Sequence, residues 1–492
     1  MKHPFFDEEM RIGLKNVMFH NKTPLKNVIT HDKIPLKNVI MYEVPAMRRK
    51  IMDELIKWKN SPHDKALVVK GLRQVGKTYI INEFCHENYD HVVYVNFKEQ
   101  KEIRSIFDGD LIIDNIVVLL SAAIPGVRFV PHKTIIFFDE IQECSRARTS
   151  LKTFVMDGRF DVIASGSLLG LRDYNKKLKQ DVPVGYEHFL TMRPMDFEEF
   201  LWAIGIDESV IASLKLYLDE KKAVPAVIHK KMMEYYRQYL VVGGMPSVVS
   251  RFIQNRDMNE VLENQRDLLQ GYKDDFGKHL NDDENEMINQ SLLSKIEAVF
   301  NCIPAQLAKE NSKFQYSEIK KSARAREYSS SVQWLVDYGL VDYCFNLRMP
   351  QLPLEGNKEE DVFKLYMSDT GLFVAMLEDG TAADILNHRL FQYKGVIYEN
   401  AIADAFLKNG RKLYYYHKDS GLEVDYVIRY QSKPTLVEVK AKTGDTKAAK
   451  TILKNQDIYH VDSLIKLGDY NIGFENNILT LPYYMAFLIK EM

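Results

Sequence analysis

The strongest constraint on this chain is a short glycine-containing segment between an apolar run and a run compatible with a helix. The segment follows Ala66–Lys70 and reads Gly71, Leu72, Arg73, Gln74, Val75, Gly76, Lys77, Thr78. Two glycines at this spacing let the backbone wrap so that successive N–H groups point at one anion. Lys77 can then reach the outer phosphates, and the Thr78 hydroxyl can ligate Mg²⁺. The segment therefore predicts binding of ATP or a related triphosphate together with Mg²⁺.

Length and composition limit what else the chain can be. At 492 residues it is too long for one core, and chains of this length usually form about three domains. Hydrophobic residues make up 46% and charged residues 27%, which is typical of globular proteins. The net charge of −2 excludes a globally basic protein, so any contact with nucleic acid must use a local basic patch.

The cysteines and apolar runs indicate the compartment. The longest apolar stretch, Leu111–Pro125, is interrupted by Asp114 and is too short to span a bilayer. The N-terminal residues lack the apolar core of an export signal. We therefore expect a cytoplasmic protein without a membrane partner. Its thiols should be reduced and mostly buried, because they are far apart and form no C-x-x-C pair. They are Cys85, Cys144, Cys302 and Cys344.

Changes of sequence texture divide the chain into five parts. Residues 1–42 contain Leu-Lys-Asn-Val three times, at 14–17, 25–28 and 36–39. Prolines precede two of the copies and argue against a continuous helix, so we expect an extended tail without chemistry. The predicted parts are a tail at 1–42, an ATPase core at 43–195, a helical lid or connector at 196–285, a winged-helix-like module at 286–350 and a C-terminal α/β domain at 351–492.

Buried strands alternate with helical segments in the ATPase core. Apolar runs are expected to form strands at 66–70, 91–97, 133–138 and 160–164. Continuous apolar strands between helices are typical of a parallel sheet that is covered on both faces. The predicted fold class is accordingly α/β, with a parallel sheet of the P-loop type.

The third and fourth of these strands each end in polar residues. Asp139 and Glu140 follow the strand at 133–138 and reach the carboxyl end of the sheet, where ligands of such sheets bind. Asp139 can hold Mg²⁺, directly or through water, and Glu140 can orient and deprotonate an attacking water. Ser167 follows the fourth strand and can contact the γ-phosphate or the water, although Ser165 competes for that role. The catalytic candidates are therefore Glu140, Lys77 and Ser167, and the metal candidates are Thr78 and Asp139.

These motifs occur together with others in a recognisable order. The phosphate-binding segment, Ile135–Gln142 and Ala164–Gly170 are followed by Pro183–Glu187, Arg193–Phe200 and Gly243–Pro246. From about residue 43 to the end, the chain resembles AAA-type ATPases that carry a C-terminal domain of unknown function, DUF4143. In AAA-type ATPases an arginine usually reaches a neighbour's γ-phosphate, and a homo-oligomer follows if it acts in trans. The resemblance does not choose among the candidates, which include Arg159, Arg193 and Arg237.

The middle of the chain is predicted to be helical. After 196–285, which Gly243–Pro246 interrupts, Pro304 is expected to open a helix, with further helices starting at Ser317 and Ser329 and a strand near Leu340. This order favours a winged helix, which the resemblance also implies. A local basic patch in it suits phosphate contacts, although it could equally be a solvated surface. The patch comprises Lys313, Lys320, Lys321, Arg324 and Arg326.

A second group of chemically competent residues lies near the C-terminus. Glu399 falls in an amphipathic helix, Asp425 in an expected strand at 422–429, and Glu438 and Lys440 on one face of a strand at 435–440. These four match the PD-(D/E)xK nuclease pattern position by position. Such residues could bind Mg²⁺ and hold a water for phosphodiester attack. The alternative is a nuclease-like fold that is kept for binding, because the pattern is short.

The sequence therefore supports one leading hypothesis and one rival. The leading hypothesis is an Mg²⁺-dependent ATP-hydrolysing protein whose nucleotide state repositions a winged-helix module and a nuclease-like domain on nucleic acid, DNA in preference to RNA. The rival is a regulatory ATPase that binds protein partners and whose C-terminal domain is catalytically silent.

Overall fold

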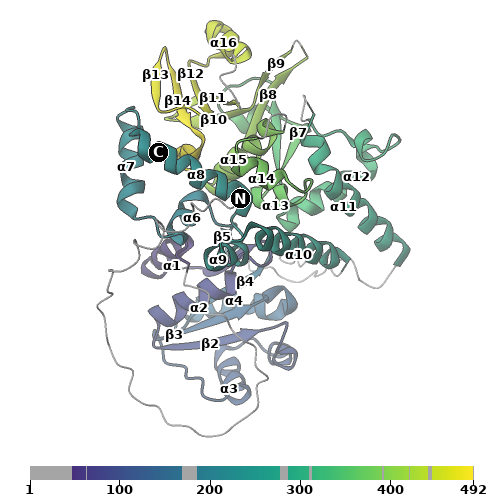
Figure 1. The fold of residues 1–492 in the computed structure, drawn as a ribbon. Helices are drawn as coiled ribbons and strands as arrows, with labels where there is room; N and C mark the ends of the chain where they lie inside the picture. The colour runs from purple at the N-terminus through teal and green to yellow at the C-terminus, as the bar shows by residue number, and fades with distance from the viewer. Residues whose placement is uncertain are drawn as a thin grey trace, which may run out of the picture. The chain divides into compact units, whose positions relative to one another are not determined.

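The structure is a computed structural model, and it describes most of the chain. The described residues are 47–61, 64–168, 185–277, 286–309, 313–389, 393–419, 421–440 and 446–490. The repeat-bearing tail at 1–42 lies outside them. Figure 1 shows the arrangement of the elements.

The ATPase core contains one parallel sheet. Its order is β2-β3-β4-β1-β5, and every neighbouring pair runs parallel. The strands are β1 (Ala66–Gly71), β2 (His91–Asn96), β3 (Thr134–Asp139), β4 (Asp161–Ser167) and β5 (Glu187–Met192). The first four strands match the apolar runs of the sequence, and this confirms the α/β class. The fifth, β5, was not predicted: it is an edge strand with partly exposed residues and so lacks a continuous apolar run.

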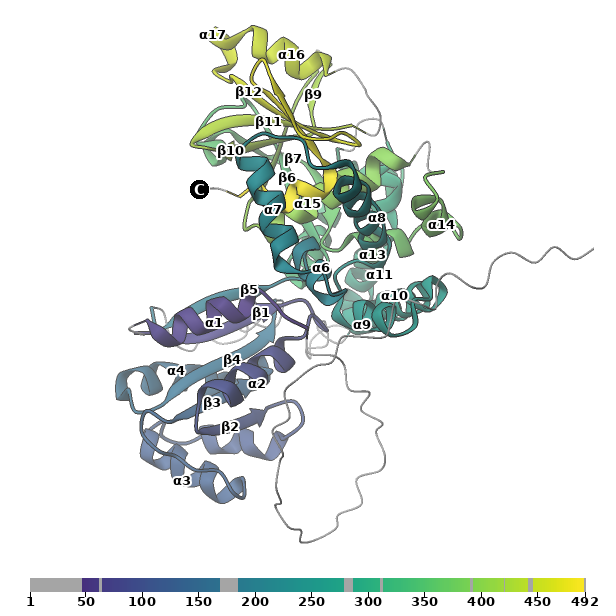
Figure 2. The same ribbon diagram turned by 60° about the vertical axis from the view of Figure 1, so that its left-hand side comes forward.

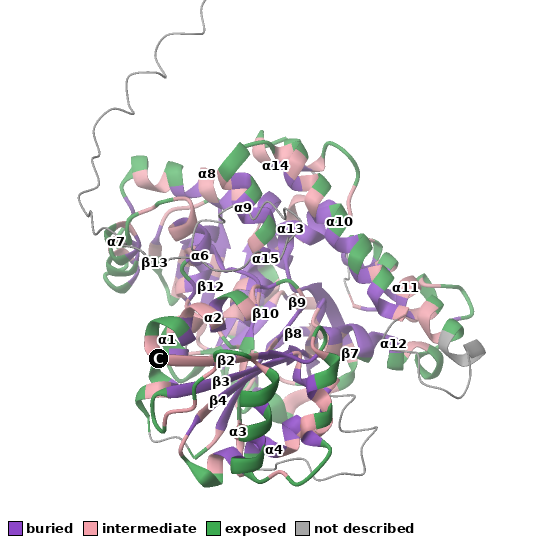
Figure 3. Cartoon of the chain, turned by 90° about the horizontal axis from the view of Figure 1, so that it is seen from below, coloured by how far each residue is buried: buried purple, intermediate pink, exposed green. Residues whose placement is uncertain are grey.

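Helices cover both faces of this sheet. Because side chains alternate along each strand, successive residues of one strand are buried in two different cores. Leu67 and Val69 face one core together with α2, whereas Val68 faces a second core with α3 and α4. The helices are α1 (Ile51–Asn60), α2 (Lys77–Asn88), η1 (Lys101–Phe107), α3 (Ile113–Ala123), η2 (Ile141–Glu143) and α4 (Ser145–Asp157). In Figure 3 the strand β3 is buried, whereas much of the helix α3 is exposed.

A helical region follows the sheet, as the sequence predicted. Its helices are α6 (Phe197–Ala203), α7 (Glu208–Asp219), α8 (Ala226–Val242), α9 (Pro246–Asn255) and α10 (Met258–Phe276). Gly243–Met245 separates α8 from α9, which confirms the expected break. The break is also a packing point: the Gly244 N–H donates to Asp369 Oδ2 at 2.6 Å, and Met195 N donates to Gly244 O at 2.7 Å.

The next segment has the predicted order of helices and strands, with different bounds. Its elements are α11 (Glu286–Leu307), η4 (Tyr316–Glu318), α12 (Ala325–Tyr338), β6 (Val341–Leu347), η5 (Leu354–Asn357) and β7 (Lys358–Met367). The helix expected to open at Pro304 is wrong, since Pro304 lies inside α11. Burial of Val299, Ile303 and Leu307 outweighs the hydrogen bond that a proline cannot donate. The helix expected from Ser317 is only the short turn η4.

The remaining elements form two mixed sheets with helices. They are α13 (Thr370–Ala375), α14 (Thr381–Leu386), α15 (Lys394–Lys408), β8 (Leu413–Lys418), β9 (Leu422–Val424), β10 (Tyr426–Tyr430), β11 (Lys433–Lys440), α16 (Lys447–Lys454), α17 (Gln456–Tyr459), β12 (Ser463–Gly468), β13 (Gly473–Glu475), β14 (Ile478–Pro482) and η6 (Tyr483–Leu488). The sheet orders are β10-β11-β12-β14-β13 and β7-β6-β8-β9. The second sheet joins strands from both sides of the boundary predicted at residue 350, and Figure 2 shows β6 and β7 beside the C-terminal strands.

The single strand expected at 422–429 is wrong. Asp425 separates β9, which pairs with β8, from β10, which pairs with β11. The chain passes from one sheet to the other at this residue, so the strand has to break there.

Candidate functional site

The phosphate-binding segment lies between β1 and α2, in the context that the sequence predicted. Gly76 has a φ of 90°, a conformation that residues with a Cβ rarely adopt. The Lys77 Nζ donates to the carbonyl oxygens of Gly71 and Leu72, each at 3.0 Å. The ammonium group is therefore held inside the curve of the loop, where the phosphates of a nucleotide would contact it.

Burial changes the acidity of this lysine. Loss of hydration lowers the pKa of Lys77 to about 8, and the nearby carboxylates of Glu140 and Asp139 only partly oppose this effect. An anion placed in the loop would favour the charged form of Lys77. The loop is therefore electrostatically suited to phosphate groups.

Asp139 organises the end of the sheet beside the loop. Its Oδ2 accepts a hydrogen bond from Thr78 Oγ1 at 2.9 Å, from Tyr94 Oη at 3.0 Å and from Asn96 Nδ2 at 3.4 Å. Ser165 Oγ donates to its Oδ1. The carboxylate is 2% exposed, so these donors replace water around a buried charge. The structure thus brings the two predicted metal candidates, Thr78 and Asp139, into direct contact.

Glu140 and Ser167 lie at the same end of the sheet. Glu140 follows β3 with a φ of 52°, and its Oε2 accepts a hydrogen bond from Gln142 Nε2. Ser167 ends β4 and is paired in register with Gly71, the first residue of the loop. All the residues predicted for the ATP site therefore gather around the loop.

The oxygen ligands fit a magnesium ion that is bound together with a nucleotide. Mg²⁺ prefers oxygen and usually uses one or two protein groups plus phosphates of the substrate. Thr78 and Asp139 supply such oxygens. Among the described residues, no group of three or more His, Cys, Asp or Glu side chains could hold a metal ion by itself. This arrangement suits an ion that arrives with ATP.

The sequence missed several of these contacts. Asn96 ends β2 and lies in register with Asp139. A polar residue closing the apolar run at 91–97 was the available signal, because the carboxyl ends of parallel strands meet at one edge. Tyr94 lies inside the same apolar run, and the sequence gave no signal for its contact with Asp139. Ser165 was considered only as a competitor of Ser167.

The loop is also fastened to the helical region. Arg73 forms an ion pair with Asp275 near the end of α10, and Tyr338 of α12 donates to the other carboxylate oxygen of Asp275 at 2.8 Å. Tyr272 donates to the backbone oxygen of Arg73 at 3.0 Å. These contacts connect the loop to two helices that are remote in sequence.

The three arginines considered as donors to a neighbouring subunit lie in different environments. Arg193 makes two hydrogen bonds to Asp342, at 2.9 and 3.0 Å, and is therefore engaged within this chain. Arg237 is buried. Arg159 is partly exposed and pairs with Asp157 and Asp114.

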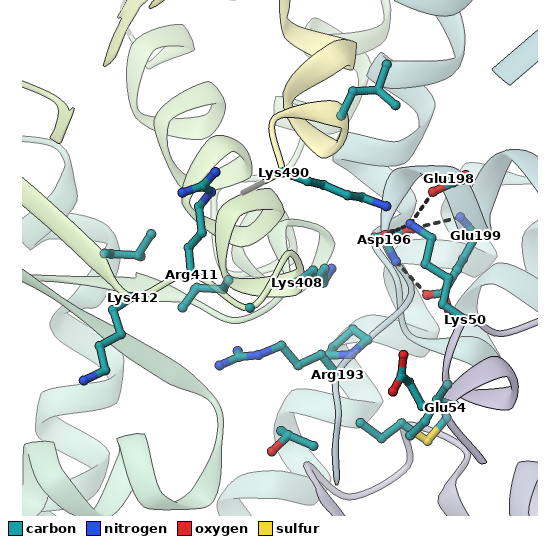
Figure 4. A pocket seen from close by; sticks show the side chains of 18 of the residues that line it. Lys50, Glu54, Arg193, Asp196, Glu198, Glu199, Lys408, Arg411, Lys412 and Lys490 are labelled. Atoms are coloured by element: carbon teal, nitrogen blue, oxygen red, sulfur yellow. Dashed lines mark hydrogen bonds and ion pairs between the residues drawn. The ribbon is translucent and has the colours of Figure 1, made fainter. Parts of the chain in front are cut away.

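A large cavity lies apart from the phosphate loop. Its volume is about 1370 Å³, and its lining includes the β5 exit, α6, α7 and the C-terminal end of α15, without any residue of Gly71–Thr78. Figure 4 shows Arg411 and Lys412 on one side and Lys50 with its acidic partners on the other. Because Lys50 pairs with Asp196 and Glu198, much of the charge on that side is internally balanced.

The four residues proposed for the nuclease-like site, Glu399, Asp425, Glu438 and Lys440, lie in one region of the C-terminal domain. Glu438 and Lys440 form an ion pair of 2.5 Å on β11, which confirms that they share a face. Asp425 Oδ2 accepts a hydrogen bond from the backbone N–H of Val439 at 2.6 Å. Glu399 lies on α15 and accepts from Lys364 of β7 at 3.1 Å. Lys364 was not predicted from the sequence.

The parallel sheet and its loop define a P-loop nucleoside triphosphatase of the AAA type. Residues 63–201 match the family model of the AAA domain, and residues 394–484 match that of a domain of unknown function, DUF4143. The chain therefore contains an AAA domain and a C-terminal DUF4143 domain, as its motifs predicted. Residues 233–383 match another domain of unknown function, DUF8612. No curated protein sequence matches the chain.

Solved structures show weaker likenesses. The ORC2 protein of Aeropyrum pernix in its ADPNP–ADP complexes shares 13% identity, covering 72% of this chain and 92% of that chain with a TM-score of 0.34. The RuvB Holliday junction branch migration motor of Thermotoga maritima shares 12% identity, covering 60% and 89% with a TM-score of 0.27. PCH-2 of C. elegans shares 12% identity, covering 44% and 67% with a TM-score of 0.26. At such scores we transfer nothing from these proteins to this chain.

The cysteines and the apolar character of the helices can be compared with the expectations from the sequence. Cys85, Cys144, Cys302 and Cys344 are all free thiols, and only Cys302 is not fully buried. Within the described ranges, no helix is both long and apolar enough to cross a membrane.

Proposed function

We propose that this protein hydrolyses ATP with Mg²⁺ and uses its nucleotide state to control a winged-helix-like module and a nuclease-like domain on nucleic acid. In this proposal Lys77 contacts the β- and γ-phosphates, and Thr78 and Asp139 hold the metal ion. When bound, Mg²⁺ supplies neutralisation of the developing phosphate charge.

The hydrolytic step is assigned to residues at the end of the sheet. Glu140 follows the strand that carries Asp139, so its carboxylate can accept a proton from a water placed opposite the leaving group. Gln142 donates a hydrogen bond to Glu140 and orients that carboxylate. Ser167 lies across from Gly71 and can donate to the γ-phosphate or the water.

The link from the loop through Asp275 of α10 to α12 is the observation that carries the control part of the proposal. Arg73 is part of the phosphate loop, yet its side chain pairs with Asp275, which also accepts from Tyr338. The loop backbone accepts from Tyr272 as well. A change of loop conformation upon nucleotide binding would therefore have to move or strain the end of α12.

The opposite end of α12 carries the basic patch. Lys320, Lys321, Arg324 and Arg326 are exposed, and Arg324 directly precedes the first residue of the helix. Cations at a helix N-terminus, where backbone N–H groups are also available, suit phosphate groups of a nucleic acid. We place the nucleic-acid contact at this end of α12, with DNA preferred over RNA.

A binding experiment tests this proposal. Fluorescence anisotropy would measure the affinity of the full chain for labelled single- and double-stranded DNA and RNA, with a non-hydrolysable ATP analogue, with ADP and without nucleotide. We expect salt-dependent binding that differs between the nucleotide states. Replacing Arg324 and Arg326 by Gln should weaken binding and reduce the salt slope by about 1 for each phosphate that is no longer neutralised. Lys433→Gln, at an exposed site on β11, is the matched control.

A second candidate function is a regulatory ATPase that binds protein partners. The pairing of Glu399 with a buried lysine favours it, because this carboxylate is one of the four proposed for the nuclease site. Absence of salt-dependent nucleic-acid binding in every nucleotide state would leave this second candidate. A homo-oligomer is proposed for either function if an arginine acts in trans, and Arg159 is the most exposed of the three candidates.

A further inference from the structure

A buried lysine lies within a cluster of carboxylates in the C-terminal domain, which comprises Glu399, Glu423, Asp425 and Glu438. The Lys364 Nζ donates to Glu399 Oε1 at 3.1 Å and to Glu423 Oε1 at 3.2 Å. Its side chain is 1% exposed. The Tyr366 hydroxyl donates to the same oxygen of Glu399. Glu399 is therefore turned towards two donors on β7.

The other members of the group also have partners. Glu438 pairs with the Lys440 ammonium at 2.5 Å. Asp425 accepts from the Val439 N–H at 2.6 Å. Burial, followed by repulsion from Glu438 and Glu399, raises the pKa of Asp425 to about 8. The ammonium groups of Lys364 and Lys440 thus already form ion pairs with carboxylates of this region.

This arrangement does not fit the magnesium ion of a nuclease. A divalent metal needs several oxygens that converge on one point and are free to coordinate it. In the described part of the chain, no three acidic or metal-ligating side chains form such a group. A metal ion that recruited Glu399 would lie close to Lys364 and would take one of the two carboxylate partners from that buried ammonium, which is unfavourable.

The ion pairs also cross a boundary between two matched regions. Lys364 lies in the segment 233–383 that matches DUF8612, and Glu399 and Glu423 lie in the segment 394–484 that matches DUF4143. The same junction is continuous in the backbone, because β6 pairs with β7 on one side and with β8 on the other. The buried lysine therefore joins the two regions at a shared sheet.

We infer that Lys364 occupies the place of a metal ion in the cluster of carboxylates of the C-terminal domain. This cluster is then an ion-paired clamp between the DUF8612 and DUF4143 regions and not a metal-dependent nuclease centre. The inference concerns this domain alone and holds whether or not ATP controls nucleic-acid binding. A domain of this kind can bind nucleic acid or protein without cutting a phosphodiester bond.

Titration with Mn²⁺ tests the inference directly. Electron paramagnetic resonance would count Mn²⁺ ions bound to the full chain without nucleotide, next to the Asp425→Asn and Glu438→Gln variants. We expect the three proteins to bind equal numbers of Mn²⁺ ions, and none to cleave labelled DNA or RNA. A bound ion that is lost in both variants, or cleavage that Lys440→Ala abolishes, would overturn the inference.

Removal of the lysine provides a second test. Lys364→Met keeps an unbranched side chain of similar length and removes the ammonium. The freed carboxylates should therefore gain Mn²⁺ binding, and added Mn²⁺ should raise the melting temperature of the variant. Lys433→Met, which removes an exposed ion pair with Asp462, should do neither. A Lys364→Met protein with unchanged stability and unchanged Mn²⁺ binding would contradict the clamp. If this variant does not fold, the titration of the unchanged chain still decides.

Discussion

Arg73, inside the phosphate loop, forms an ion pair with Asp275 of α10, although 202 positions separate the two residues in sequence. In this loop the Lys77 ammonium lies against the carbonyls of Gly71 and Leu72, whereas the Arg73 side chain is directed away, towards the helical region. One loop thus contains a group for the nucleotide and a group for the rest of the chain.

The first prediction concerns this ion pair. Arg73→Met should lower the free energy of unfolding by about 1–3 kcal/mol, because it leaves the nearly buried carboxylate of Asp275 without its charged partner. The double variant with Asp275→Asn should lose less than the sum of the single losses, and urea unfolding of all four proteins measures this coupling. Arg48→Met, at an exposed pair with Glu208, should cost at most about 1 kcal/mol. Additive losses in the cycle would contradict the proposed link.

The second prediction concerns the protonation of Lys77. Its pKa of about 8 in the nucleotide-free protein means that part of the population is neutral at pH 8. Phosphates favour the charged form, so ATP binding at pH 8 should take up a fraction of a proton, and at pH 6.5 this uptake should vanish. Calorimetric titrations in buffers of different ionisation enthalpy measure it. Equal proton uptake at both pH values would be inconsistent with this environment.

The third prediction concerns the close packing at Gly244. A Cβ at this position would lie 2.0 Å from the carbonyl oxygen of Met195. Gly244→Ala should therefore lower the melting temperature strongly or prevent folding. Gly271, within α10, has no atom within 4 Å of such a Cβ, so Gly271→Ala should stabilise the protein by up to about 1 kcal/mol. Thermal unfolding of the two variants should shift in opposite directions, and a shared direction would argue against this packing.

The fourth prediction concerns pH and Asp425. Its pKa is about 8 in the folded protein and about 3.9 in an unfolded chain. Between these values the folded state binds more protons, so this group makes the protein less stable as the pH rises from about 4 to about 8. Asp425→Asn should reduce that slope, because it removes the group that titrates, while its amide oxygen can still accept the hydrogen bond from the Val439 N–H. Urea unfolding at several pH values measures the slope, with the exposed site Asp457→Asn as control. An unchanged slope in Asp425→Asn would refute the assignment.

The residues predicted around the phosphate loop lie together in the structure, because the sequence signals for their positions are local. Gly76, Lys77 and Thr78 are contiguous, and Asp139 directly ends an apolar strand, so spacing and periodicity were sufficient. The first four strands of the parallel sheet were found for the same reason. In contrast, β5 is an edge strand with exposed side chains and lacks the apolar run on which such predictions depend.

The remaining features depend on distant contacts. Lys364 is an ordinary lysine in the sequence, and only the pairing of β6 with both β7 and β8 brings it to Glu399. Likewise, Asp425 falls in an alternating run that reads as one strand, but the chain changes sheets at that residue. Pro304 favours the start of a helix by local rules, whereas packing keeps it inside α11. Tertiary contacts outweigh local propensity at these positions.

ATP turnover by two single variants tests the central claim most directly. Lys77→Ala should weaken ATP binding by about 10- to 100-fold, because a charged hydrogen-bonding partner of the phosphates is removed. Glu140→Gln should bind ATP like the unchanged chain and lose hydrolysis by about 100- to 10,000-fold, as expected when a general base is removed. Nucleotide binding and phosphate release would be measured on the same preparations. Normal hydrolysis by Glu140→Gln, or unchanged ATP affinity of Lys77→Ala, would contradict this account.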